Sequence, residues 1–280
     1  MKRAVAAAGP LAPAALLTAI AFVLPLAWLL RLSLDRSSGG GMLVDAVTAA
    51  NYLRFLGDGF YLGVLWRSTW MAALASALTL LLSYPLALFL ARTRSRWRGF
   101  LAVLTIAPLL VSSVVRTFGW MVILGDQGWV NGLLRLVSLT AAPLRLMNNM
   151  LGVLIGLTEV MMPVMTLALI AGFARLDPTL EEAARSLGAP PRKVLLRVTL
   201  PLSMPGVLLG SLVTFVLSIS SFVTPKLLGG GRVAVLATSI YEEALETLNW
   251  PFAAAISVVL VAVFGVALML YERAMRRWMI

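Results

Sequence analysis

Residues 175–201 read RLDPTLEEAARSLGAPPRKVLLRVTLP and lie between two long apolar runs of the chain. The first part has the features of a short, free-standing helix, because Asp177 can cap its first turn and Pro178 suits the first helical position. Gly188 stands where a left-handed residue would end this helix, and the Pro190–Pro191 pair prevents its continuation. The segment therefore predicts an exposed helix whose two alanines allow another surface to approach closely.

The chain on both sides of this loop is strongly apolar. Of its 280 residues, 60% are hydrophobic and only 12% are charged, whereas a soluble domain is about half apolar and about a quarter charged. So much apolar surface cannot be buried inside one water-soluble globule of this length. Most of the chain is therefore expected to have lipid as its solvent.

Six segments are long enough to cross a membrane, which requires about 20 mostly apolar residues. The predicted spans are residues 8–30, 66–91, 99–124, 150–173, 201–224 and 249–272. The first is too long to be the core of a signal peptide, so we expect it to be retained. Prolines inside the spans predict kinks, because neighbouring membrane helices can satisfy the freed carbonyls.

The basic residues indicate the orientation of these spans. The two termini, residues 92–98 and residues 175–197 hold most of the 23 Lys and Arg side chains. Acidic residues favour the alternate loops, including residues 226–246. The positive-inside rule then places both termini and the loop 175–200 in the cytoplasm. The sequence thus predicts one all-α membrane domain over residues 1–280, with six spans.

Several kinds of chemistry are excluded by what the sequence lacks. It has no cysteine and no histidine, which removes disulfides, thiol nucleophiles, Cys/His metal sites and imidazole acid–base catalysis. The net charge of +11 comes largely from short loops between apolar runs, where it sets membrane topology and does not indicate nucleic-acid binding. No G-x-x-x-x-G-K-[ST] motif is present to cradle nucleotide phosphates. We expect no catalytic residue, no metal site and no enzyme activity.

The loop also carries a spaced signature. Glu182-Ala183-Ala184, three residues, Gly188, nine residues, and then Val198-Thr199-Leu200-Pro201 resembles the EAA signature of binding-protein-dependent ATP-binding-cassette (ABC) permeases. Val198 stands where that family usually has isoleucine. Four shorter stretches look like the spermidine/putrescine branch of these permeases: SVVRTFGW (113–120), GWVN (128–131), FVTPKLLGG (222–230) and NWP (249–251).

This resemblance implies the MetI-like permease fold of type I importers, several spans in the bacterial inner membrane, and alternating access. In the family the loop is a coupling helix that lies in a groove of a separate ATPase. Carried over to this chain, the predicted ATPase-coupling residues are Glu181, Glu182, Ala183, Ala184, Leu187 and Gly188. ATP and Mg would be bound by the ATPase, and this chain would hold no cofactor. The implied partners are an ATPase dimer, a second permease (a heterodimer is favoured) and a periplasmic or lipid-anchored solute-binding protein.

The resemblance favours a polyamine such as spermidine or putrescine as the substrate. Relatives in the same branch take up amino-acid derivatives, opines, phosphonates or iron complexes, so these substrates stay open. Three other classes are alternatives: a secondary transporter needs a coupling-ion site, a channel needs a selectivity filter, and a membrane enzyme needs clustered catalytic groups. Dependence of uptake on ATP and on a second gene product separates an ABC permease from all three.

Glu159 is the one acidic residue placed deep in a span. It lies about ten residues into the fourth span, about 15 Å deep and close to the bilayer midplane. Such a group can line a watery pathway or pack between helices, and both interpretations stay open. Met162 and Phe222 are the other predicted pathway residues, and Arg116 is interpreted as an anchor near the outer interface.

Overall fold

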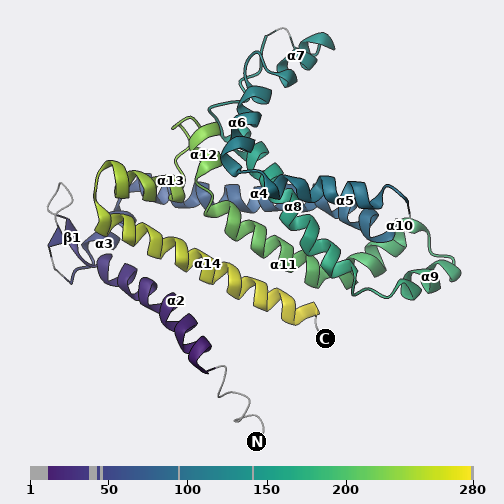
Figure 1. Ribbon diagram of the computed structural model, residues 1–280, viewed down its shortest axis with the longest axis horizontal. Coiled ribbons are helices and arrows are strands. Elements are labelled where there is room, and N and C mark those ends of the chain that lie inside the picture. Colours follow the sequence, from purple (N-terminus) through teal and green to yellow (C-terminus); the bar gives the residue numbers. More distant parts are fainter. Residues whose placement is uncertain (1–11, 38–42, 45–46, 94, 141, 279–280) are drawn as a thin grey trace, which may run out of the picture. The chain divides into compact units, whose positions relative to one another are not determined.

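The computed structural model describes residues 12–37, 43–44, 47–93, 95–140 and 142–278 (Figure 1). Most of these residues are helical, which confirms the predicted all-α class. The exception is one short antiparallel pair, in which β1 (Arg36–Ser37) lies beside β2 (Leu43–Val44) with Arg36 opposite Val44. The helices are α2 (Ala12–Leu32), α3 (Ala50–Gly57), α4 (Gly59–Arg92), α5 (Arg98–Ile106), α6 (Ser113–Leu124), α7 (Trp129–Leu136), α8 (Met150–Phe173), α9 (Pro178–Ser186), α10 (Pro191–Val194), α11 (Leu200–Ile219), α12 (Val223–Leu228), α13 (Leu236–Tyr241) and α14 (Trp250–Trp278).

Four helical segments of the described chain are long and apolar enough to cross a membrane: Gly59–Arg92, Met150–Phe173, Pro191–Ile219 and Trp250–Arg277. They coincide with four of the predicted spans, and α8 has the predicted bounds. The predicted end of the fifth span was wrong, because α11 stops at Ile219 and a separate helix follows. Pro225 has no N–H to continue the hydrogen-bonding ladder across this junction.

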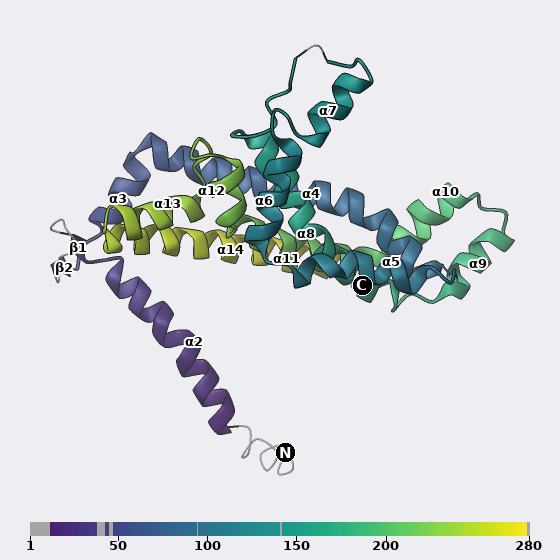
Figure 2. The same cartoon turned by 45° about the horizontal axis from the view of Figure 1, so that its top comes forward.

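The predicted third span is not one continuous helix. α5 passes into a 3₁₀ turn at Ala107–Leu110, the backbone is extended at Val111, and the Ser112 side chain accepts a hydrogen bond from the Val114 N–H to begin α6. The segments on either side of this break are bent by 104° (Figure 2). Pro108 and the capping Ser112 together produce a break where we predicted only a kink.

The predicted first span lies partly outside the described residues, since residues 8–11 are not described. The described part is α2, whose apolar side chains are exposed along most of its length. If the bent pair counts as one span, the described chain holds up to five spans by length and composition. The count of six, the orientation and the single permease domain stay predictions.

The chain divides into two compact units, one comprising residues 1–62 and 239–262 and the other comprising residues 63–238 and 263–280. In the first unit the buried Glu243 accepts hydrogen bonds from the Tyr61 hydroxyl (2.7 Å) and the Thr247 hydroxyl (2.8 Å). The Arg54 guanidinium lies 3.6 Å from the same carboxylate. Charge patterning assigned Glu243 to an outward loop, but the structure places it inside this unit.

In the second unit α8 packs along α11, and both views show these helices side by side (Figures 1 and 2). Their closest approach is at Gly172 and Gly206, where a methyl group added to either residue would lie 2.9 Å from the Cα atom of the other. Small residues allow membrane helices to pack this closely. Met165, Leu169 and other buried side chains of α8 extend the core toward α4.

Candidate functional site

The first part of residues 175–201 forms a capped helix, as predicted. The Asp177 carboxylate accepts a hydrogen bond from the Thr179 N–H at 2.9 Å and begins α9, with Pro178 at the first position. This backbone hydrogen bond lowers the pKa of the Asp177 carboxyl below its usual value. Gly188 has a φ of +81°, the left-handed conformation that ends the helix at low cost.

The chain returns from α9 directly into a membrane span. α10 begins at Pro191, Leu195–Thr199 form a π-helical turn, and α11 continues to Ile219 without a break. α9 is in contact with both α10 and the π-helical turn. α9 therefore contacts the chain close to the start of a helical segment that continues to Ile219.

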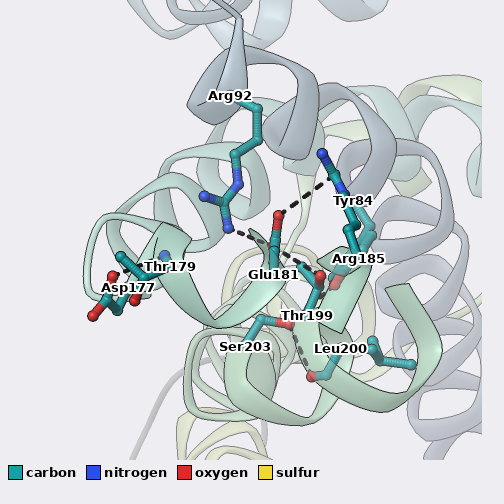
Figure 3. A network of polar contacts seen from close by, with 9 residues as sticks. All are labelled: Tyr84, Arg92, Asp177, Thr179, Glu181, Arg185, Thr199, Leu200 and Ser203. Atoms are coloured by element: carbon teal, nitrogen blue, oxygen red, sulfur yellow. Dashed lines mark hydrogen bonds and ion pairs between the residues drawn. The ribbon is translucent and has the colours of Figure 1, made fainter. Parts of the chain in front are cut away.

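Glu181 fixes α9 to its neighbours (Figure 3). Its Oε1 atom accepts hydrogen bonds from Arg92 Nη2 at 2.5 Å and from Thr199 Oγ1 at 2.8 Å. Arg92 is the last residue of α4, and Thr199 is the last residue of the π-helical turn. Arg185, one turn further along α9, lies 4.0 Å from the other carboxylate oxygen. Glu181 therefore joins α9 to two of the long helices. We call Arg92, Glu181 and Thr199 the clasp.

The six predicted coupling residues do not share one face. The Glu181 side chain is 13% exposed and faces the protein, and Ala184 is half-buried behind it. Leu187 is 88% exposed, and three further members of the set are exposed with it: Glu182, Ala183 and Gly188. α9 and its C-cap thus present two large exposed apolar side chains, Leu180 and Leu187, among small and polar ones.

A second polar cluster lies between two helices of the membrane region. Glu159 of α8 accepts a hydrogen bond at Oε2 from Trp120 Nε1, at 3.1 Å. Its Oε1 atom lies 3.6 Å from Arg116 Nη1, and the Arg116 side chain is only 13% exposed. Arg116 and Trp120 are four residues apart on α6, so they face the same way. Our interpretation of Arg116 as an interfacial anchor was wrong, because it is paired with Glu159.

Glu159 also lines a cavity of about 460 Å³. α4 contributes Leu78, Leu81 and Leu82, α6 contributes Trp120, and α8 contributes Met162 beside Glu159. Glu159 is the one ionisable side chain among the described residues of this lining. Two predicted pathway residues therefore share one cavity. Phe222, the third, packs instead against the buried cluster that includes Val153, Leu157 and Leu228.

The family model for "Binding-protein-dependent transport system inner membrane component" matches residues 83–280, which contain both polar clusters. The chain belongs to this family. The spermidine/putrescine transport system permease protein PotB of Haemophilus influenzae is 34% identical over 256 residues, covering 91% of this permease and 89% of that protein. PotB of Escherichia coli is 35% identical over 229 residues, covering 82% and 83%.

Solved structures show the same fold. A bacterial ABC transporter involved in the import of the acidic polysaccharide alginate matches with a TM-score of 0.74 and 18% identity, covering 99% of this permease and 96% of that chain. The MetNI methionine ABC transporter, in an inward-facing conformation, matches with a TM-score of 0.59 and 16% identity, covering 79% and 99%. The resemblance to ABC importer permeases and the MetI-like fold are thereby confirmed.

Sequence reasoning missed the partners of both carboxylates in the permease. Arg92 was counted only as a topological charge, and Thr199 only as part of the motif that opens α11. Trp120 stood out only as part of the stretch SVVRTFGW (113–120). The available signal was weak: a basic residue at the end of one span, and an Arg and a Trp spaced one helical turn apart.

Proposed function

We propose that this chain is the membrane-spanning permease subunit of an ABC importer for polyamines, and that α9 is the helix through which a separate ATPase drives it. The exposed face of α9, held from behind by the clasp, is the observation that carries this proposal. The substrate class is supported by relatives at 34% and 35% identity that are named spermidine/putrescine permeases.

The outer face of α9 is suited to contact with the ATPase. Leu187 would enter an apolar pocket of that partner, while Ala183 and Gly188 allow its backbone to come close. Glu182 would add a charged contact at the rim. Glu181 would not touch the ATPase, and would instead carry the movement of α9 into α4 and α11 through the clasp. ATP and Mg would be held entirely by the ATPase dimer.

The other partners are a second permease subunit, preferentially a sister chain, and a solute-binding protein on the outer side. One structural relative is an alginate transporter in complex with a substrate-bound periplasmic protein, which supports the second of these partners. Substrate delivered from outside would move through the permease pair by alternating access. Glu159 and Met162 would line that route, whereas Phe222 would support it from the adjoining core.

Uptake into proteoliposomes tests the proposal. The complex should import radiolabelled spermidine or putrescine only when ATP is inside and the binding protein is outside. Uptake of a phosphonate or an amino-acid derivative in place of polyamine would contradict polyamine as the substrate, but would leave the coupling role of α9 unaffected. Uptake that needs no ATP would reject the importer itself.

The role of α9 is tested by Leu187→Arg. Truncating or replacing a central apolar contact commonly costs an interface about 2 kcal/mol or more. We therefore expect recovery of the ATPase with the permease, and uptake, to fall at least about tenfold. Leu196, 61% exposed in the π-helical turn that follows α10 and outside the predicted contact set, provides the control as Leu196→Arg. Equal ATPase recovery by both variants would contradict the assignment.

A further inference from the structure

The Arg116–Glu159 pair is loosely made. The two side chains approach to 3.6 Å, and no hydrogen bond joins them in the described structure. Arg116 Nε and Nη1 are buried, and neither has a hydrogen-bond partner among the described residues. Arg92 also has an unpaired Nε, but its Nη2 makes the 2.5 Å bond to Glu181. A buried guanidinium with two unpaired donors contributes little to the stability of the fold. No hydrogen bond of the described structure has to be broken when the guanidinium moves away from Glu159.

The cavity beside this pair has the chemistry of a site for an alkylammonium group. Leu78, Leu81 and Leu82 present an apolar wall, and Glu159 is the one carboxylate in the described lining. Methylene groups would lie against the leucines. A terminal ammonium group would meet the carboxylate beside Trp120, which lines the same cavity.

Charge balance links the two observations. A carboxylate at membrane depth is costly unless a positive charge is close to it. Arg116 supplies that charge in the structure as described, and a bound ammonium group would supply it when substrate is present. Exchanging one cation for the other keeps the charge beside Glu159 constant, so no proton has to move.

We propose that Arg116 is a tethered competing cation, which occupies Glu159 when the pathway is empty and is displaced by an ammonium group of the substrate during transport. This inference rests on the proposed polyamine substrate. Arg116 keeps the empty site neutral and also weakens the substrate's hold on it. An amine that entered the cavity would therefore be released instead of trapped.

Direct binding to the assembled complex tests the exchange. The permease with its ATPase and sister subunit, in lipid nanodiscs without the binding protein, is titrated with putrescine by calorimetry. 1,4-Butanediol is the uncharged control of equal chain length. Arg116→Gln should bind putrescine about tenfold more tightly than the wild type, since a competing charge is gone. Glu159→Gln should bind it no better than the diol.

Arg116→Lys is a second variant, which keeps the test decisive if Arg116→Gln fails to assemble. Lysine keeps the charge but is shorter, so it should compete less well and raise the putrescine affinity by a smaller factor. Wild-type affinity in both Arg116 variants, or weaker affinity in Arg116→Gln, overturns the exchange.

Polyamine uptake by the wild-type complex is measured in parallel. Normal uptake with no affinity change in the Arg116 variants refutes only the tethered cation. Absence of any polyamine uptake refutes the proposed substrate.

Discussion

Glu181 and Glu159 each face an arginine from a neighbouring helix, but the two pairs are built differently. Glu181 is hydrogen-bonded to Arg92 at 2.5 Å and to Thr199 at 2.8 Å. Among the described residues, Glu159 is hydrogen-bonded only to Trp120 and stands 3.6 Å from Arg116 without a hydrogen bond. The first pair holds three segments in one arrangement, whereas the second is open to a competitor.

The two ion pairs lie in different parts of the permease, and each position requires a different kind of contact. A helix that transmits force needs a short, directional connection to the spans, and charge-assisted hydrogen bonds provide one. A site that binds a cation and releases it must avoid a tight partner, because every contact would have to be broken in each cycle. The geometry of an ion pair therefore distinguishes transmission from exchange better than the residue types do, since both pairs are arginine with glutamate.

Reversing the charge of Glu181 in the clasp should cause the largest loss of uptake. Glu181→Arg places a third guanidinium beside Arg92 and Arg185, and removes the acceptor for Thr199. Removing one member of a largely buried pair costs about 3 kcal/mol or more. We expect uptake to fall at least about tenfold, while ATP hydrolysis continues. Uptake and hydrolysis are measured on the same proteoliposomes.

The double exchange Arg92→Glu with Glu181→Arg is the control for that variant. It restores opposite charges at the same two positions, and should recover part of the lost uptake. Glu181→Gln should fall between the wild type and the reversal, because it keeps an acceptor for Thr199 without the charge. Full uptake in Glu181→Arg would show that the clasp does not carry movement.

Local rules predicted much of the loop. Asp177, Pro178 and Gly188 act on the backbone within a turn of their own positions, so their effects could be derived from the sequence before any packing was known. The bounds of α8 followed equally directly, from an apolar run with polar ends. The break at Val111 was missed because the apolar run continues across it, although Pro108 and Ser112 are both local signals.

The pairing of charges could not be derived in this way. Glu181 and Glu182 are adjacent in sequence and differ by about 100° around the helix, and only the position of α4 shows which one is covered. Arg116 and Glu159 come from separate helices, and their meeting depends on the bend between α5 and α6. Long-range contact, and not residue type, decides both sites.

Double-mutant cycles measure the coupling free energy of each pair, and a smaller effect than that of the charge reversal is expected. One cycle removes the charges of Arg92 and Glu181 by glutamine substitution, and the other treats Arg116 and Glu159 in the same way. Contacting charges commonly couple by about 0.5–3 kcal/mol. We expect the clasp near the middle of that range and the membrane pair at or below its lower end. Thermal unfolding of the purified complexes supplies the comparison. A stronger coupling between Arg116 and Glu159 would contradict an exchangeable pair.

The smallest effect is expected at Asp177, which begins α9 but does not position it. Asp177→Ala removes the acceptor of the Thr179 N–H, so the first turn should fray and uptake should fall a few-fold at most, well short of the clasp reversal. Asp177→Asn keeps an acceptor and should behave as the wild type.

Because the folded pKa of Asp177 is depressed, the contribution of its carboxylate to stability is complete above the carboxyl's unfolded pKa and is lost only as the pH falls through the folded value. The ratio of Asp177→Ala to wild-type uptake should therefore be constant from pH 8 to about pH 5. A ratio that changes in this window, or an Asp177→Ala defect as large as that of Glu181→Arg, would mean that the cap itself transmits the movement of α9.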